Sequence, residues 1–404
     1  MTDGLPAVPG LPMTRGRCPF DPAPELGVLR ADHPVARMEF PDGHVGWLVT
    51  GYTQVRALLS DPRMSSRGEA LRSPIPLPMA TDRTEPAPGM FTAMDPPEHT
   101  RYRRAVAAWF SARRTRTLEP RLKELAERHL DAMDAMGAGK GEGPVDLVTG
   151  FAEPMAASVI CELLGVPLSE RPAFARAIKA LFAVHSSAEE AIAGWHAITG
   201  LLRGLVEAKR AEPADDLLAT LVTEGRLTDE ELVTVGSVLL TAGYDTSANM
   251  IALGTFALLE HPEQSAALAA DTSLAERAVE ELLRYLTVVH AGGIRAVGED
   301  LEFEGHRMAA GDAVSLSFAA ANRDPVLCAR PDELDVTREP VPHLAFGHGI
   351  HQCVGQQLAR LELRVALTAL FGRFPRLRLG IPAGEVRTRP DMIIYGVQEL
   401  PVTW

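Results

Sequence analysis

The sequence feature that most constrains the fold is a long stretch without proline, which begins after Thr228 and ends at Pro262. Thr228 and Glu231 have the spacing of a capping box, which predicts the start of a helix at this point. A helix that continued to Pro262 would be about 45 Å long at about 1.5 Å per residue. Such a helix would cross a whole domain, so we expect it to be the central element of the fold.

Helical patterns account for most of the remaining chain. Asp95 is a candidate helix cap, with Pro96 at the first helical position and Glu98 three residues after the cap. The glycine-rich run from Gly137 to Gly143 indicates a flexible break. Further helices are predicted at Leu118–Met136, Val148–Gly165, Glu170–Lys209, Leu274–Leu286 and Cys353–Phe371.

Strand patterns are short and few. Val35–Thr50 has the pattern of a hairpin around a Pro-Asp-Gly turn, and short strands are expected between Ile294 and Phe318. The tail, Met392–Trp404, is predicted to be a second hairpin, and the proline-rich segment Asp61–Met94 to be a loop. We therefore expect a mainly α fold with a small β portion. No linker divides the chain, so residues 1–404 are predicted to form a single domain.

Composition excludes several classes of protein. The formal net charge is −13, and a net-acidic chain is a poor general binder of nucleic acid or of an anionic membrane. The four cysteines are far apart in the sequence, which does not favour a zinc knuckle or a disulfide framework. The first 20 residues lack a signal-peptide pattern, and no run approaches the ~18 apolar residues of a membrane span. We expect a cytoplasmic protein.

The segment from Phe346 to Gly355, Phe-Gly-His-Gly-Ile-His-Gln-Cys-Val-Gly, contains one cysteine, Cys353, among several glycines. Glycines let the backbone approach a flat group closely and adopt unusual conformations. A helix is predicted directly after Cys353, and its free amides would stabilise a thiolate. A lone cysteine in a turn is more often a small buried thiol, so a functional interpretation of Cys353 depends on the whole decapeptide.

This decapeptide resembles the haem-binding loop of the cytochrome P450 family, Phe-x-x-Gly-x-x-x-Cys-x-Gly, at every fixed position. The resemblance implies the P450 fold, haem b as cofactor, and Cys353 as the axial ligand of the iron. It also implies that Phe346 and Gly355 lie against the haem. In that family the thiolate donates electron density to the iron and favours cleavage of the O–O bond.

A second motif, Ala242-Gly243-Tyr244-Asp245-Thr246-Ser247, lies in the middle of the long helix. An acid and an alcohol between apolar stretches need a reason, because buried polar groups are costly. The motif resembles the family's oxygen-activation motif. The resemblance implies a locally opened helix, with Ala242 against the haem and with Asp245 and Thr246 delivering protons to dioxygen.

Further residues match positions that bind the haem propionates in the family. They are His99 and Arg103, at i and i+4 of one helix, Arg295 in a predicted strand, and His351, two residues before the cysteine. The guanidinium fork of arginine suits a carboxylate. The same stretch also contains other arginines, most of which we expect to be solvated.

A third motif, Glu281-Leu282-Leu283-Arg284, resembles the family's structural pair and gains weight from Arg338. Glu and Arg at i and i+3 share a helix face. The resemblance implies a buried network of these three residues that holds the cysteine loop. Leu334 departs from the family pattern, which more often has an aromatic residue there.

The resemblance covers nearly the whole chain and implies a monooxygenase. Such an enzyme inserts one oxygen atom of dioxygen into an apolar organic substrate, by C–H hydroxylation or epoxidation. Soluble bacterial members often tailor secondary metabolites. One alternative is a catalytically idle member that serves in partner recruitment or haem sensing, which the presence of Cys353, Asp245 and Thr246 disfavours. Another keeps the haem but performs peroxide-driven hydroxylation or oxidative coupling, which the intact Asp245 and Thr246 disfavour only mildly. The substrate pocket is expected to include parts of 61–94, 181–187, 239–243, 288–294 and 392–395, with His290 as a possible polar contact.

Electrons must come from another protein, because no GxGxxG follows a predicted strand. We expect a ferredoxin-type donor with a separate NAD(P)H reductase. An acidic donor would need a local basic patch on this net-acidic chain. The candidate patch contains Arg101, Arg104, Arg113, Arg114, Arg360 and Arg364.

Overall fold

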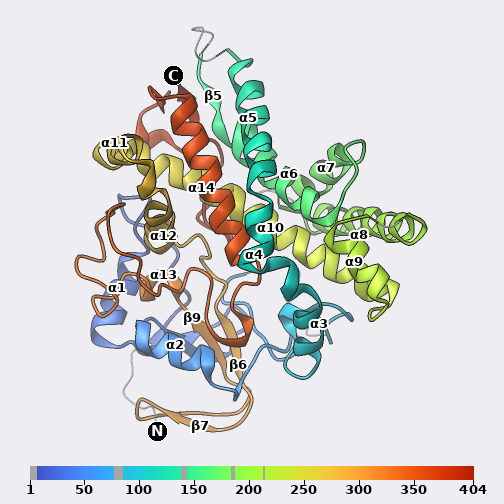
Figure 1. Cartoon of the computed structure of the whole chain (residues 1–404). Coiled ribbons are helices and arrows are strands. Elements are labelled where there is room, and N and C mark those ends of the chain that lie inside the picture. The colour runs from blue at the N-terminus through green and yellow to red at the C-terminus, as the bar shows by residue number, and fades with distance from the viewer. Residues whose placement is uncertain (1–6, 77–84, 138–142, 183–186, 213) are drawn as a thin grey trace.

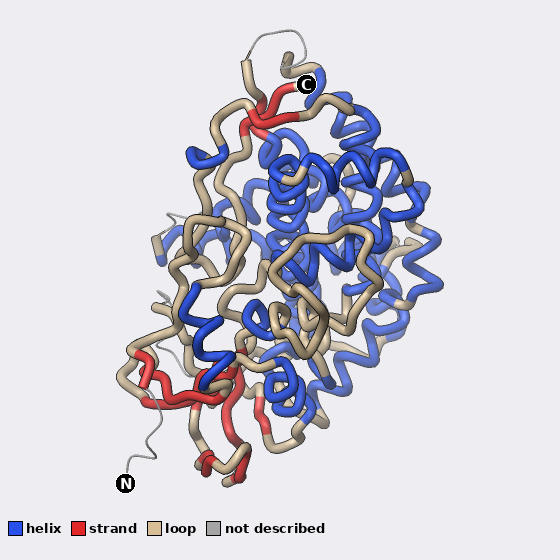
Figure 2. The backbone as a smooth tube through the Cα atoms, turned by 90° about the vertical axis from the view of Figure 1, so that its left-hand side faces the viewer, coloured by secondary structure: helices blue, strands red, loops and turns tan. Residues whose placement is uncertain are grey.

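The computed structural model describes residues 1–404 except 1–6, 77–84, 138–142, 183–186 and 213. Helices dominate it, and the largest sheet lies at one end while a small sheet lies at the other (Figures 1 and 2). The prediction of a mainly α fold with a small β portion is confirmed. The helices are α1 Pro24–Asp32, α2 Tyr52–Ser60, α3 Glu98–Ala107, α4 Ala112–Thr117, α5 Glu119–Asp134, α6 Glu153–Leu164, α7 Arg171–Phe182, α8 Ala188–Ala211, α9 Leu217–Glu224, α10 Asp229–Glu260, α11 Pro262–Ala270, α12 Ala275–Leu286, α13 Phe318–Ala321 and α14 Gln356–Arg373.

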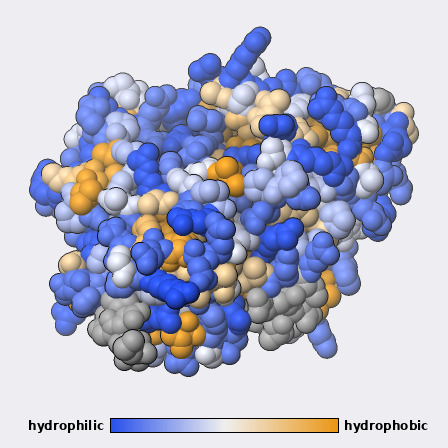
Figure 3. All heavy atoms as spheres, turned by 90° about the horizontal axis from the view of Figure 1, so that it is seen from below, coloured by the Kyte–Doolittle hydropathy of each residue, from blue (hydrophilic) through white to orange (hydrophobic). Residues whose placement is uncertain are grey.

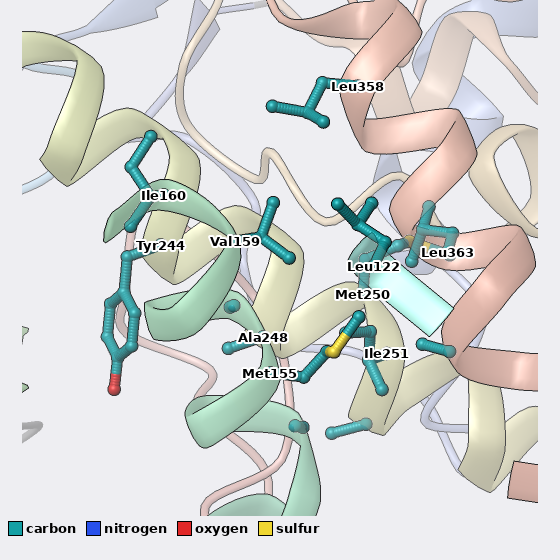
Figure 4. Close-up of a cluster of buried hydrophobic side chains, with 14 of the residues drawn as sticks. Leu122, Met155, Val159, Ile160, Tyr244, Ala248, Met250, Ile251, Leu358 and Leu363 are labelled. Atoms are coloured by element: carbon teal, nitrogen blue, oxygen red, sulfur yellow. The ribbon is translucent and has the colours of Figure 1, made fainter. Parts of the chain in front are cut away.

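The long helix α10 is the central element, as predicted. Its N-terminus has the full capping box, in which the Thr228 hydroxyl accepts from the Glu231 amide and the Glu231 carboxylate accepts from the Thr228 amide. Apolar side chains of α10 pack between those of α6 and α14 (Figure 4). The close-up shows Met250 and Ile251 of α10 between Met155 of α6 and Leu363 of α14. This packing buries most of α10 and explains why its sequence is apolar on nearly every face.

The main sheet has six strands in the order β1-β2-β3-β9-β6-β4. The predicted hairpin is β2 and β3, which pair antiparallel from Val35 opposite Val49 to Glu39 opposite Val45. Strand β9 extends it by pairing parallel to β3. The strand bounds are β1 Ala7–Val8, β2 Val35–Glu39, β3 Val45–Val49, β4 Met64–Ser65, β5 Val145–Asp146, β6 Ile294–Val297, β7 Leu301–Phe303, β8 His306–Met308, β9 Ala313–Leu316, β10 Arg378–Leu379 and β11 Pro401–Thr403.

The predicted hairpin at Met392–Trp404 is wrong. Strand β11 pairs instead with β10 and β5, which are distant in the sequence. The preceding residues form single bridges, Ile394 with Val289 and Val397 with Thr388. An isolated two-stranded hairpin is marginal in water. The tail therefore gains its hydrogen bonds from segments that are already held by the core.

The predicted helix cap at Asp95 is also wrong. Helix α3 begins at Glu98, after Pro97. The Asp95 carboxylate instead accepts hydrogen bonds from the Ser65 hydroxyl, at 2.6 Å, and the Ser66 amide, at 2.7 Å. These donors lie in another segment of the chain, so local spacing does not reveal them.

Other boundaries differ by a few residues from those predicted. The segment from Glu170 to Lys209 contains two helices, and a second capping box at Ser187 and Glu190 starts α8. The helix at 148–165 begins with a π-helical turn before α6, and α14 begins at Gln356 rather than at Cys353. Most of the predicted break at Gly137–Gly143 lies outside the described residues.

No helix among the described residues is long and apolar enough to cross a membrane. On the face shown in Figure 3, hydrophobic residues are interspersed with hydrophilic ones. The cytoplasmic location and the single domain over residues 1–404 stay predictions.

A buried ion network joins α12 to the loop before α14. The Arg284 guanidinium donates to both carboxylate oxygens of Glu281 at 2.8 Å, and these side chains are 0% and 1% exposed. Arg338 donates to Glu281 from the loop at 3.1 Å. Arg284 also donates to the carbonyls of Asn322, Pro331 and Glu333. The three residues predicted to form a network are therefore in contact.

We expect Arg284→Ala to lower the free energy of unfolding by about 3–5 kcal/mol, because it leaves the Glu281 carboxylate buried without its main cation. Urea unfolding followed by circular dichroism measures this. The control is Arg330→Ala, which removes an exposed pair with Glu333 and should change stability by about 0.5 kcal/mol or less. Equal losses in the two variants would contradict a special role for the buried pair.

Candidate active site

A cavity of about 670 Å³ lies between α10 and the segment that contains Cys353. Its walls are mainly apolar and come from α6, α8, α10, α12 and α14 and from the loops between them. Cys353, His351, Arg295, Phe346, Gly355, Ala242, Asp245 and Thr246 all line it. The structure therefore brings together most of the residues that the sequence motifs singled out.

The loop that carries Cys353 is held by its own backbone and by α2. The Cys353 amide donates to the Phe346 carbonyl at 2.9 Å. Gly349 has a φ of +74°, and a Cβ there would lie 2.3 Å from the Leu59 carbonyl oxygen. Only glycine allows both the backbone conformation and this close contact. The loop is thus pressed against α2 and its shape is well defined.

The electrostatic surroundings of Cys353 are mixed. Burial raises the pKa of its thiol, while the backbone amide of Gly355 and the charges of Arg103 and Arg360 act in the opposite direction. The side chain of Arg103 donates to the Gln352 carbonyl, next to the cysteine. Amides at the start of a helix favour a thiolate. The sulfur therefore lies where a bound cation would complete the stabilisation of its anionic form.

The four side chains predicted to bind propionates lie near one another, and two of them, Arg295 and His351, line the cavity. The rings of His99 and His351 are 4.1 Å apart between centroids, and Arg103 and Arg295 influence the pKa of both. Burial lowers the pKa of His351 to about 3 and that of Arg295 to about 10. Both ring nitrogens of His99 and the Nε2 atom of His351 lack a hydrogen-bond partner among the described residues. Buried polar atoms are normally paired, so this cluster is suited to an acidic ligand.

The motif in α10 differs from the predicted geometry. The helix is continuous from Asp229 to Glu260, and the Thr246 hydroxyl donates to the Ala242 carbonyl at 2.8 Å. The helix is therefore not interrupted at this motif, and the Thr246 side chain binds the carbonyl one turn before it. Thr246 satisfies its hydroxyl within the helix, as threonine often does. Asp245 is buried, and its Oδ1 accepts from Arg389 and from Asn249, both at 2.9 Å.

Sequence reasoning missed a second buried acid, Glu362 of α14. It is 3% exposed and accepts a 3.0 Å hydrogen bond from the Ser247 hydroxyl of α10. Burial raises the pKa of this carboxyl to about 8. The available signal was an acid between Leu361 and Leu363, both on the buried part of an amphipathic helix. Glu362 and Ser247 both line the cavity.

The predicted substrate pocket is largely present. Of the expected segments, the cavity includes Met90 and Thr92, the 239–243 part of α10, Val288 and Val289, and Ile393 and Ile394. Most of the 181–187 turn lies outside the described residues. His290 does not line this cavity, because its ring packs edge-on against Tyr395 with centroids 5.6 Å apart. Trp195 of α8 and Phe110 line the cavity and were not predicted.

Comparison with known proteins gives consistent matches. The family model described as Cytochrome P450 matches residues 195–377. Cytochrome P450 105C1 from a Streptomyces species is 49% identical, over 95% of this chain and 96% of its own. Pentalenic acid synthase of Streptomyces avermitilis is 42% identical, over 96% and 95% of the two chains. The crystal structure of CYP105P1 in complex with filipin I has a TM-score of 0.90 and 43% identity, over 98% of this chain and 99% of that one.

A cysteine loop that faces a long central helix across an apolar cavity is the architecture of the haem-dependent monooxygenases. The match of 49% identity over nearly the full length shows that this chain belongs to the cytochrome P450 family. The chain is a monooxygenase, and haem b is its cofactor. Membership in this family also implies redox partners and a small-molecule substrate.

The residues present fit haem b. The cavity has a half-buried thiol on the wall opposite α10, and apolar walls suit the porphyrin faces. The ring nitrogens of His99 and Nε2 of His351 have no partner in the described part of the chain and, with Arg103 and Arg295, suit the two propionates. The donor set is thus one soft ligand for the metal and several cations for the acidic edge.

The pKa of Glu362 leads to a prediction about stability. The folded state keeps a proton at this site up to about pH 8, whereas the unfolded chain releases it near pH ~4.3. The contribution of this group to stability must therefore fall as the pH rises through this window, by up to about 1.4 kcal/mol per pH unit. Glu362→Gln should lose this dependence and become more stable than the wild type at the upper end.

Urea unfolding of the holoenzyme at several values between pH 5.5 and 8.5 measures the difference. Glu127→Gln, at an exposed position of α5, is the control and should follow the wild type at every pH. Parallel curves for the wild type and Glu362→Gln would show that this carboxyl ionises normally in the folded protein.

Proposed function

We propose that this chain is a haem-thiolate monooxygenase in which Cys353 ligates the iron and His99, Arg103, Arg295 and His351 bind the propionates. The observation that carries the proposal is the meeting of a half-buried thiol, a cluster of basic side chains and an acid–alcohol pair around one apolar cavity. Phe346, Gly355 and Ala242 line the same cavity and would contact the porphyrin.

When bound, haem supplies the oxidising chemistry: dioxygen, two electrons and two protons yield one oxygen atom in the substrate and one water. The chain's own residues bind, orient and exclude water. Thr246 and Asp245 of α10 are proposed to carry the protons, because one is a hydroxyl at the cavity wall and the other is a buried acid beside it. The Thr246 hydroxyl would first have to exchange its bond to the Ala242 carbonyl for one across the cavity.

The substrate is proposed to be an apolar organic molecule that is hydroxylated or epoxidised during secondary metabolism. The apolar walls support this class, for example Val238 and Leu239 of α10, Val289, Ile393 and Ile394. The related proteins include pentalenic acid synthase and a CYP105P1 that binds filipin I. A ligand screen that follows the haem absorption band as water leaves the iron would identify compounds that enter this cavity.

The proposed electron donor is a small acidic ferredoxin, reduced by a separate NAD(P)H reductase. Four of the six arginines in the predicted patch already have carboxylate partners: Arg101 with Glu231, Arg114 with Asp215, Arg360 with Glu280 and Arg364 with Glu119. Arg104 and Arg113 are exposed, and no ion pair of either is present within the described ranges. These two are therefore the better candidates to attract an acidic partner, because their charge is not neutralised locally.

The first test concerns the iron ligand. The reduced protein with carbon monoxide should show the strongly red-shifted absorption band of thiolate ligation, and Cys353→Ala should abolish it. Cys161→Ala and Cys328→Ala are the controls, and both should keep the band. The assignment fails if Cys353→Ala retains the band or if either control loses it.

The second test concerns the electron donor. Reduction by an acidic ferredoxin should slow as ionic strength rises, because salt screens steering. Arg104→Glu and Arg113→Glu should each slow the association further, by about ten-fold at low salt. Arg376→Glu, elsewhere on the chain, serves as a control for net charge. A reduction rate that responds neither to salt nor to these two variants would show that the donor docks elsewhere or is not acidic.

A further inference from the structure

The C-terminal segment 387–398, here called the tail loop, contacts both the substrate cavity and the acid of the α10 motif. Its base is closed by the bridge between Thr388 and Val397 and by the Arg389 amide, which donates to the Gly396 carbonyl at 2.9 Å. Its tip contains Ile393 and Ile394, which line the cavity. One short loop thus contributes to the substrate pocket and, through its base, contacts α10.

The base of the tail loop binds the acid of the α10 motif. The Arg389 Nη1 atom donates to Asp245 Oδ1 at 2.9 Å, and the two side chains are 8% and 7% exposed. Asn249 donates to the same oxygen from one turn further along α10. Within the described residues, no hydrogen bond reaches the other oxygen, Oδ2. One carboxylate oxygen is fixed and the other remains for exchange of a proton.

The loop backbone also fits closely against this site. A Cβ on Gly396 would lie 1.9 Å from the Asn249 side-chain oxygen, so a larger residue there would displace the Asn249 amide. The tail loop therefore contacts both Asp245, through Arg389, and the Asn249 side chain that donates to it. Such packing leaves the carboxylate few alternative orientations.

The charges around Asp245 act in opposite directions. On balance the pKa of this carboxyl lies above its ordinary value, because burial raises it more than Arg389 and the hydrogen bond from Asn249 lower it. Tyr244 of α10 is also affected by Asp245 and Arg389, and Glu153 of α6 faces the same tyrosine. On the α14 side, Glu362 contacts the same stretch of α10 through Ser247. Of these groups, Arg389 is the cation that opposes the effect of burial.

We propose that Arg389 is a positioning residue for proton delivery: it holds Oδ1 of Asp245 from the tail loop, so that the acid keeps one orientation and a charged form that can accept a proton. This inference rests on the proposed role of Asp245 and Thr246. It adds that the relay is completed by a residue of the substrate-contacting loop, and not by α10 alone.

The direct test is a pH titration of the Asp245 carboxyl by infrared spectroscopy of the holoenzyme, in which Asp245→Asn identifies the band. Arg389→Gln removes the cation, so protonation of Asp245 should occur at a pH about one unit or more higher than in the wild type. Arg389→Lys keeps the positive charge, so its titration should lie close to that of the wild type. Arg387→Gln is the matched control, since Arg387 lies on the same loop but pairs with Glu399 near the surface.

The second readout is hydrogen peroxide released per NADPH oxidised, with the compound that gives the largest absorption shift in the ligand screen. Arg389→Gln should release several-fold more peroxide. The effect is expected to be modest because the acid itself remains, whereas removal of a positioned acid typically lowers the rate by ~10²–10⁴-fold. The pH at which product formation per NADPH is half-maximal should also move upward. Haem content and the carbon monoxide spectrum establish that each variant is folded.

The outcomes distinguish a failure of the role of Arg389 from a failure of proton delivery by Asp245 and Thr246. If Arg389→Gln leaves the titration of Asp245 unchanged, or if it shifts the titration without changing the peroxide yield, the role of Arg389 is refuted. If Asp245→Asn and Thr246→Ala themselves leave the yield of product per NADPH unchanged, the proposed proton delivery fails, whatever Arg389 does to the titration.

Discussion

The geometry of the cysteine loop depends on the ion pair of Arg284 with Glu281, in which the guanidinium is buried without contact to solvent. Besides Glu281, the guanidinium binds the Asn322 carbonyl, and the Asn322 side chain accepts from the Leu344 amide at 2.6 Å. Leu344 in turn accepts from Gly347, within the loop that ends at Cys353. A buried ion pair is expensive to desolvate and is stable only when all of its hydrogen bonds are made. A displaced loop would break these bonds, so the ion pair selects one position of the cysteine.

The parts of the fold that could be predicted from the sequence are those determined by neighbours along the chain. The capping box at Thr228 and Glu231, the hairpin of β2 and β3, and the loop around Cys353 carry their information within a few residues. The failures share a cause: Asp95 and the tail at 392–404 hydrogen-bond to segments that local periodicity does not reveal. For the same reason, Glu362 and Arg389 emerge only when helices and loops are placed together.

The two buried acids of the cavity show how environment divides one kind of side chain into two kinds of group. Glu362 has a serine hydroxyl as its hydrogen-bond donor, and burial keeps it protonated to about pH 8. Asp245 has a guanidinium and an amide on one oxygen, which oppose the same effect of burial. Acids whose environments push their pKa values apart can hold different roles at one pH. Neutral Glu362 is a fixed donor or acceptor, and Asp245 is the acid whose charge is adjustable.

The tail loop has a consequence for how such an enzyme can change its substrate range. Residues at its tip, Ile393 and Ile394, contact the cavity, whereas Arg389 at its base holds Asp245. A mutation that reshapes the tip to admit a different molecule also pulls on a short, doubly bridged segment. Substrate selectivity and the yield of product per electron consumed therefore depend on the same dozen residues. Natural or laboratory selection for the amount of product alone will accept mutations at the tip of the loop that also waste reductant.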